Sequence, residues 1–375
     1  MFELSNSIFK TKFKLRILVL IFSFHSMVMF AQEANDNFGM AYLDYRNYLY
    51  FFKDGIPQQL ESQAVRNFNS KGEIVGYVNS ANNLIAYYNG EKTDLGDATN
   101  TTFNLTNHLL IYQRDQVLGV FDKGKLTRLT YFLRDYKIND ELIAFRDQNI
   151  DILKLYYNGK VQDLEYTLIG SLGAYKVGKN TVAYMSSSGY FKIFDDGQVF
   201  EIDNIAPIQF DAGKNIVGYV DGSQQSLNVF YNTKVLTLEP IKPLSFQVGD
   251  DLMAYVSDEG YFKIFTQGKL LKAESYAPDF YQVLNSSVLF FADNKLQVLQ
   301  KGIRYVLDDF KPLSYKMNEN AIAWQDPAKR LHVFVNGQVK SVTSEIFVGY
   351  ELNGDILRYQ LEDGTSHIYF NGKNY

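Results

Sequence analysis

The chain has 375 residues, no cysteine and a formal net charge of −5 at pH 7. The lack of cysteine excludes disulfides, thiolate metal sites and a lipid anchor on an N-terminal cysteine. The negative charge makes nucleic acid and anionic membrane surfaces poor partners. The 28 Tyr and 29 Phe favour β-sheets, because flat rings pack well across neighbouring strands.

The N-terminal segment differs in character from the rest of the chain. A basic stretch, 10–16, precedes an apolar run, 17–31, that ends in a small residue. The run is about 15 residues long, shorter than the ~20 that a membrane-spanning helix needs. The pattern therefore predicts a signal peptide over residues 1–31, export to the periplasm or release, and no membrane insertion after cleavage. Residues 32–375 are predicted to form one β-propeller repeat domain.

A tripeptide of aliphatic, usually small, then aromatic residues recurs through the rest of the chain. Its third position is aromatic in all ten copies, and its middle position is Ala or Gly in seven. The copies are 40–42, 75–77, 110–112, 143–145, 182–184, 217–219, 253–255, 289–291, 322–324 and 357–359. A fixed period of this kind indicates a repeat architecture.

A turn follows each tripeptide about ten residues later, as expected for units of this length. It is Asn-Gly at 89–90 and 336–337 and Asp-Gly at 54–55 and 196–197, and successive turns lie 34–38 residues apart. Such pairs accept the positive φ that type I′ hairpins need. Each unit therefore predicts four short antiparallel strands joined as a meander, which is the blade of a propeller.

The alternating pattern also assigns faces to the strands. In "NTVAYM" and "YFKIFD", Tyr184 is expected in the core and Lys192 on the solvent side. The small middle residue of the tripeptide leaves room for a ring of the neighbouring blade.

The fold class predicted is all-β, a propeller of ten four-stranded antiparallel repeats of about 35 residues. A β-solenoid is the main alternative, but its parallel coils do not use Asn-Gly hairpins. Ten units exceed the usual four to eight blades, so one ring, an incomplete ring and two five-bladed propellers all remain open, with one continuous array favoured. The first unit lacks a clear innermost strand, and the last stops at Tyr375 before its fourth.

Three segments carry a resemblance to a known kind of repeat. They are "PIQFDAGKNIVGYV" (207–220), "PLSFQVGDDLMAYV" (243–256) and "LTRLT" (126–130), the last of which resembles the end of that repeat. The order of these residues resembles the TolB-like β-propeller repeats of bacterial envelope proteins, over roughly residues 37–375. The resemblance implies the blade architecture and carries over no functional residue.

The sequence contains no known catalytic or nucleotide-binding motif. Its acidic pairs, such as Asp195-Asp196, are favoured as turn residues over a general acid–base pair. His332 and His367 occupy the same repeat position and are expected on the blade surface. No cofactor and no metal are predicted.

One set of polar residues is predicted to form a ring on one rim. They stand two positions after the tripeptide aromatic or close to it, where turn capping is the favoured interpretation and ligand or partner binding the alternative. Arginines that break the repeat pattern are the best candidates for a binding site, because the scaffold itself does not require them. The candidate residues are Asp44, Arg46, Arg114, Arg146, Asp147, Asp221, Asp293 and Asp326.

These observations favour an exported, non-enzymatic propeller that binds a protein or acts as a scaffold in the bacterial cell envelope. Its partner is expected to be another envelope protein. The alternatives are an extracytoplasmic propeller enzyme, such as a glycoside hydrolase or lyase, and a propeller that binds a small ligand or cation. A catalytic carboxylate pair with shifted pKa values at the central channel would favour the enzyme.

Overall fold

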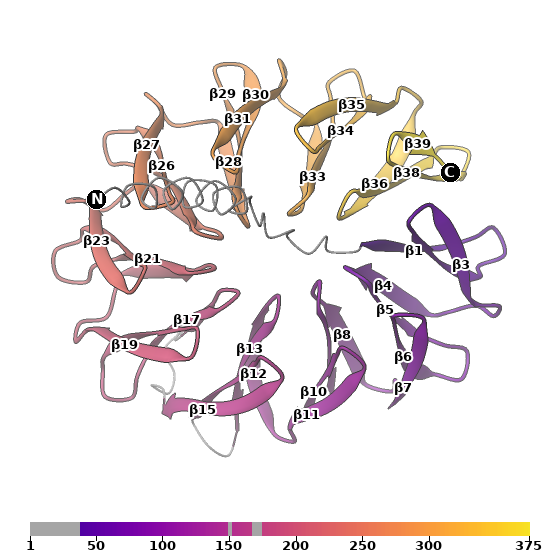
Figure 1. Ribbon diagram of the computed structural model, residues 1–375, viewed down its shortest axis with the longest axis horizontal. Helices are drawn as coiled ribbons and strands as arrows, with labels where there is room; N and C mark the ends of the chain where they lie inside the picture. The colour runs from indigo at the N-terminus through magenta and orange to yellow at the C-terminus, as the bar shows by residue number, and fades with distance from the viewer. Residues whose placement is uncertain (1–37, 149–151, 167–174) are drawn as a thin grey trace, which may run out of the picture. The chain divides into compact units, whose positions relative to one another are not determined.

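The computed structural model describes residues 38–148, 152–166 and 175–375, so the predicted signal peptide lies outside the described residues. These residues form ten antiparallel sheets arranged as the blades of a ring (Figure 1). The secondary structure in the described ranges is entirely strand and turn. Within them, no helix has the length and apolarity needed to cross a membrane.

Each blade is a meander in which every strand pairs with the next one along the chain. The first strands are β4 (Asn67–Lys71), β8 (Thr101–Leu105), β12 (Leu133–Asn139), β16 (Tyr175–Val177), β20 (Gln209–Ala212), β24 (Ser245–Val248), β28 (Phe280–Leu284), β32 (Ser314–Met317) and β36 (Phe347–Asn353). The second strands are β1 (Gly39–Leu43), β5 (Ile74–Val78), β9 (Leu109–Arg114), β13 (Leu142–Asp147), β17 (Thr181–Met185), β21 (Ile216–Val220), β25 (Leu252–Val256), β29 (Ser287–Ala292), β33 (Ala321–Gln325) and β37 (Ile356–Leu361).

The third and fourth strands lie on the outer side of the ring (Figure 1). The third strands are β2 (Leu49–Lys53), β6 (Asn83–Tyr88), β10 (Val117–Asp122), β14 (Ile152–Tyr157), β18 (Phe191–Asp195), β22 (Leu227–Tyr231), β26 (Phe262–Thr266), β30 (Lys295–Gln300), β34 (Leu331–Val335) and β38 (Ser366–Phe370). The fourth strands are β3 (Ile56–Glu61), β7 (Glu91–Asp97), β11 (Lys125–Thr130), β15 (Lys160–Tyr166), β19 (Gln198–Asp203), β23 (Lys234–Glu239), β27 (Lys269–Glu274), β31 (Ile303–Asp308), β35 (Gln338–Thr343) and β39 (Lys373–Asn374).

The two end blades differ from the other eight, and we number the blades 1 to 10 in chain order. Among the described residues, blade 1 has three strands and the nine others have four. The segment before β1 lies outside the described residues, so the expectation that the first unit lacks a clear innermost strand stays a prediction. The prediction that the last unit stops before its fourth strand is wrong. The two residues of β39 pair with β38, because the hairpin turn leaves just enough chain for a short strand.

The core lies between blades, and the tripeptide supplies much of it. Its aromatic residue Tyr184 is fully buried, as predicted. Its small middle residue is required by the next blade: a Cβ at Gly218 would lie 2.5 Å from the Met253 sulfur. Larger side chains at this position would therefore push neighbouring blades apart.

The hairpin turns have the predicted conformation. Asn89 and Gly90 have φ values of 50° and 86°, which are those of a type I′ turn. In the repeat that lacks the glycine, Asn232 and Thr233 adopt the same left-handed conformation with φ values of 50° and 59°. The repeated meander therefore fixes this turn even where the preferred residue is missing.

The ring closes between blades 1 and 10 through side chains, and in the described residues no strand is shared between them. The ring centroid of Phe52 lies 5.9 Å from that of Phe370 and 5.0 Å from that of Tyr375. Asn353 Nδ2 donates a hydrogen bond to the Gly39 carbonyl oxygen at 2.5 Å. We call this contact between the first and last blades the seam.

Candidate functional site

One rim of the ring carries all the residues that the sequence predicts as a polar rim. In a meander of four strands, the turn between the second and third strands lies at the same end as the connection from the fourth strand to the next blade. We call this the connection rim. It contains turns that include Asp44, Asp221 and Asp326 and connections such as 203–208.

The predicted acidic residues cap these turns. Asp44 Oδ1 accepts hydrogen bonds from the backbone N–H groups of Arg46 and Tyr48, each at 2.9 Å. Asp221 accepts two backbone N–H groups of its own turn, and Asp326 accepts one. The capping interpretation is therefore confirmed for these three residues, and a direct role in binding stays a prediction.

The two other predicted acids lie in equivalent places. Asp147 Oδ2 accepts a hydrogen bond from the Thr130 hydroxyl at 2.5 Å. Asp293 is exposed at its turn and has a φ of 53°. Neither residue makes a contact that points to a particular ligand.

Two of the predicted arginines pair with carboxylates of this chain. Arg46 Nη2 lies 2.9 Å from Asp44 Oδ2. Arg146 Nε donates to Asp135 Oδ1 at 3.0 Å, and the same oxygen accepts the Tyr175 hydroxyl at 2.6 Å. Asp135 thus links blade 4 to blade 5, which gives Arg146 a role within the ring.

A contact between blades, not expected from the sequence, recurs along this rim. The tripeptide aromatic of one blade donates a hydrogen bond to a carboxylate at the end of the preceding blade's fourth strand, 16 residues earlier in the chain. We call this contact the latch. The pairs are Tyr77–Glu61 at 2.7 Å, Tyr255–Glu239 at 2.6 Å and Trp324–Asp308 at 2.9 Å. Burial raises the pKa of the Tyr255 hydroxyl, and its carboxylate partner raises it further. The spacing of 16 residues between acid and aromatic could have revealed the latch.

A contact of the same kind, in which the acid stands 19 residues before the aromatic, explains one prediction that is wrong. Lys192, expected to face solvent, has a side chain that is only 16% exposed. Its ammonium lies 3.0 Å from Glu165, which also accepts the Tyr184 hydroxyl at 3.2 Å. The preceding blade supplies this carboxylate, so the alternation within a single strand could not show it.

Arg114 stands where one latch is missing. Sixteen residues before Tyr112 the chain has Gly96, and a Cβ there would lie 3.3 Å from Arg114 Nη1. The guanidinium donates to the Leu95 carbonyl oxygen at 2.9 Å and to the Thr101 hydroxyl at 3.1 Å. Arg114 therefore joins blade 3 to blade 2, where other blades use a carboxylate.

We expect Arg114→Ala to lower the free energy of unfolding by about 1–3 kcal/mol, because the Leu95 carbonyl loses a charge-assisted partner. Arg46→Ala is the matched control, since its guanidinium is exposed and its ion pair stays within one turn. Denaturant melts of both variants test this. Equal midpoints for Arg114→Ala and the wild type would show that the contact between blades 2 and 3 does not stabilise the ring.

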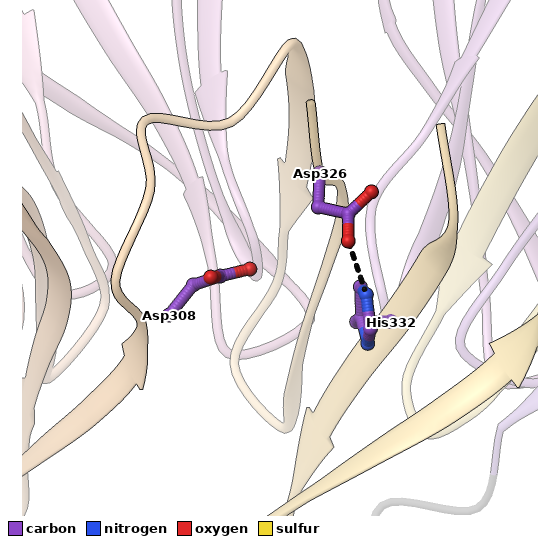
Figure 2. Close-up of side chains that lie close together, drawn as sticks. All are labelled: Asp308, Asp326 and His332. Carbon is purple, nitrogen blue, oxygen red and sulfur yellow. Dashed lines mark hydrogen bonds and ion pairs between the residues drawn. The ribbon is translucent and has the colours of Figure 1, made fainter. Parts of the chain in front are cut away.

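One group of side chains in the described residues has the donor atoms and spacing of a metal site. Asp308, Asp326 and His332 each place a ligand atom within 4.8 Å of the others (Figure 2). Asp308 already accepts the Trp324 indole N–H, and Asp326 Oδ2 lies 2.7 Å from the Arg330 guanidinium and 3.1 Å from His332 Nε2. Burial alone would raise the pKa of Asp326, but hydrogen bonds from Arg330 and His332 lower it. These contacts account for the group without an ion.

The opposite rim holds polar side chains that meet across the ring. Asn107 of blade 3 donates to Glu319 of blade 9, which also accepts Asn285 Nδ2 at 3.2 Å. Lys179 lies 2.9 Å from Asp250. Burial would lower the pKa of the Lys179 ammonium, but the carboxylates of Asp250, Asp140 and Glu319 together raise it above its usual value. Glu319 and Asp250 are therefore engaged by amides and a cation of the chain.

The connection rim also carries exposed apolar side chains in five successive connections, from blade 5 to blade 10. Their exposed fractions run from 46% to 68%. We call them the apolar arc: Ile205, Ile208, Ile241, Leu244, Tyr276, Phe310, Leu313, Ile346 and Val348. The connections into blades 2 and 3 carry exposed polar residues instead, including Gln63, Arg66 and Asn100, whereas the connection into blade 4 carries the exposed rings of Tyr131 and Phe132.

The backbone holds the apolar arc rigidly. Four connections have the same order of residues: an acid, any residue, an apolar residue, any residue and a proline. The residue after the proline begins the next blade. The four sequences are "DNIAPI", "EPIKPL", "ESYAPD" and "DDFKPL". The backbone N–H of the residue after the proline donates a hydrogen bond to a carbonyl oxygen of the second strand. Ile208 donates to Val220 and Leu244 donates to Val256, both at 2.9 Å. Proline fixes φ just before this bond. The repeated order could have been found in the sequence.

The described sheets define the protein as a β-propeller with ten blades in one ring. The chain belongs to the family described as the 10-bladed beta propeller domain, whose model matches residues 33–375. The single continuous array favoured from the sequence is thereby confirmed. No curated protein matches the chain.

Solved structures with propeller folds show limited similarity. The computationally designed Ika8 protein is 15% identical, with a TM-score of 0.35, 72% of this chain and 95% of that chain covered. The CRINKLY WD40 ectodomain of the Arabidopsis thaliana receptor kinase ACR4 is 9% identical, with a TM-score of 0.35 and 72% and 94% covered. PorZ, a surface component of the type-IX secretion system of Porphyromonas gingivalis, is 8% identical, with a TM-score of 0.32 and 82% and 51% covered.

Proposed function

We propose that the protein is an exported, non-enzymatic propeller that binds another protein of the bacterial cell envelope through the apolar arc. The observation that carries the proposal is the set of nine exposed apolar side chains at five successive connections of one rim. Contiguous apolar surface rimmed by polar residues is typical of protein interaction sites. The acidic turn caps and Arg46 would form its polar border.

The rigidity of the apolar arc supports the same function. Connections whose backbone is already held by hydrogen bonds and proline lose less conformational entropy on binding, so more of the interaction energy appears as affinity. Export is supported by the basic and apolar segments at the N-terminus, and the envelope by the resemblance to TolB-like repeats. Both the compartment and the TolB-like relationship remain predictions.

The test is affinity capture from the envelope of the protein's own cells with the double variant Leu244→Ser and Leu313→Ser. We expect the captured amount of the partner to fall about tenfold or more, because truncating a hot spot costs over ~1 kcal/mol. The melting temperature should stay unchanged, since both side chains are more than half exposed.

The matched control carries Ile303→Ser and Val339→Ser, two exposed apolar residues on the fourth strands, away from the connections. It should capture the partner as the wild type does. Capture that survives in the arc variant, or that fails equally in the control, would contradict the proposal.

A further inference from the structure

The group that Figure 2 shows at the boundary of blades 8 and 9 has an equivalent at the boundary of blades 5 and 6. Both places have an acid 16 residues before the tripeptide aromatic and a second acid two residues after it. Between blades 5 and 6 the acids are Asp203 and Asp221, and the aromatic is Tyr219. Asn228 lies directly opposite Tyr219 on the next strand, as His332 lies opposite the aromatic of blade 9. We call Asp203, Asp221 and Asn228 the oxygen cluster.

Other boundaries on this rim place a cation of the chain beside the acid. Lys192 lies 3.0 Å from Glu165, and Lys263 lies 2.6 Å from Glu239. Both lysines stand directly opposite the tripeptide aromatic of their own blade. Asn228 takes this position in blade 6, so the oxygen cluster has an uncharged amide where two other blades have an ammonium.

The cations that accompany the acids of blade 9 are also missing from blade 6. In blade 9, Asp326 lies 2.7 Å from the Arg330 guanidinium and 3.1 Å from His332 Nε2. Ser226 and Asn228 stand at the equivalent positions of blade 6, and neither carries a charge. Among the described residues, no lysine, arginine or histidine forms an ion pair with either acid of the oxygen cluster. The chain therefore leaves the two negative charges unbalanced here.

Each member of the oxygen cluster keeps one side-chain oxygen that has no hydrogen bond in the part of the chain described. Asp203 Oδ1 accepts the Ile205 N–H at 3.0 Å, and Asp221 Oδ1 accepts two backbone N–H groups of its own turn. Oδ2 of both acids accepts none. Asn228 is 5% exposed, and its Oδ1 is buried without a partner, while its Nδ2 donates to the Ser226 hydroxyl at 3.2 Å. A buried carbonyl oxygen left in this way needs an electropositive partner.

The two acids of the oxygen cluster lie against one another. A Cβ at Gly222 would lie 2.2 Å from the Ala206 carbonyl oxygen. The turn that holds Asp221 therefore packs directly on the connection that begins at Asp203. The Gln224 N–H is the main group that lowers the pKa of Asp221, and a side-chain interaction with Asp203 contributes. Two carboxylates this close repel one another unless a positive charge lies between them.

We propose that Asp203, Asp221 and Asn228 bind a calcium ion between blades 5 and 6. Ca²⁺ takes about six to eight oxygen ligands in flexible geometry, including carboxylates, amide carbonyls and water, and its charge matches that of the two acids. Zn²⁺ prefers nitrogen and sulfur, and Mg²⁺ demands a near-ideal octahedron. The ion would tie the turn of blade 6 to the connection that carries Ile205 and Ile208. The calcium site is distinct from the apolar arc, and it stands even if the arc binds nothing.

The first test titrates CaCl₂ into the protein after EDTA treatment and follows calorimetry and thermal melts. We expect one Ca²⁺ per chain with a Kd of about 0.1–1 mM, the range of extracellular sites, and a melting temperature about 3 °C or more higher in excess Ca²⁺. Asp203→Asn and Asp221→Asn keep an oxygen for the backbone caps and should each weaken binding about tenfold or more.

The matched control for these variants is Asp308→Asn, which changes the equivalent acid beside blade 9 and keeps an acceptor for the Trp324 indole. It should bind Ca²⁺ as the wild type does. A wild type that neither binds Ca²⁺ nor melts higher with it would overturn the proposal. Binding that Asp308→Asn weakens as much as Asp203→Asn does would also overturn it.

The second test supplies the missing cation from the chain itself. Asn228→Lys places an ammonium where Lys192 and Lys263 stand in their blades. We expect this variant to lose Ca²⁺ binding and to melt higher than the wild type in EDTA, because the lysine balances the two acids. Unchanged Ca²⁺ binding, or a melting temperature in EDTA no higher than that of the wild type, would refute an unbalanced pair of acids at this boundary.

Discussion

Trp324→Ala is expected to lower the free energy of unfolding by about 3–5 kcal/mol, the usual cost of removing a large buried ring. The indole is fully buried in the cluster between blades 8 and 9 and stacks on His332 with ring centroids 5.3 Å apart. Its N–H also donates to Asp308 at 2.9 Å. Denaturant melts followed by circular dichroism measure the loss.

Trp324→Phe separates the latch from the packing. It keeps an aromatic ring but leaves Asp308 without its indole donor, which we expect to cost about 1–3 kcal/mol. The exposed Lys329 on the adjacent turn is the control, and Lys329→Ala should change stability by less than about 0.5 kcal/mol. Equal losses for the alanine and phenylalanine variants would mean that the hydrogen bond, and not the ring, carries the stabilisation.

Phe52→Ala should cost a similar ~3–5 kcal/mol and should act on the seam. Phe52 is 1% exposed and packs in one cluster with Ile356 and Ile368 of the last blade. In the described residues the seam has no shared strand, so this cluster and Asn353 are what join the first and last blades. We expect hydrogen exchange to rise in blades 1 and 10 before it rises elsewhere.

Phe230→Ala is the matched control for the seam, because Phe230 is also 1% exposed but lies between blades 5 and 6. Its exchange should rise around those blades and leave the seam protected. If the two variants gave the same exchange pattern, the ring would unfold as one unit and the seam would have no separate stability.

The sequence predicted the blade well because the blade is a local structure. Strand alternation, the Asn-Gly turns and the small middle residue of the tripeptide all lie within about 35 residues, and each has a local physical cause. The burial of Tyr184 followed from the same pattern.

The contacts between blades could not be predicted in the same way. Lys192 and Arg114 meet carboxylate, carbonyl and hydroxyl oxygens that lie up to 27 residues away in the chain, and the alternation of one strand does not show these partners. Arg46, Arg114 and Arg146 depart from the repeat pattern. The structure shows that two of them, Arg114 and Arg146, depart from it to connect blades.

The closure of the ring by side chains bears on how such a protein can arise. In the described residues each blade is built from one stretch of the chain, and no blade borrows a strand from the other end. Duplication or deletion of a segment of about 35 codons therefore adds or removes a whole blade and leaves both termini at the junction. A lineage can change its blade number in single genetic steps, with only the junction residues having to readjust to the new curvature.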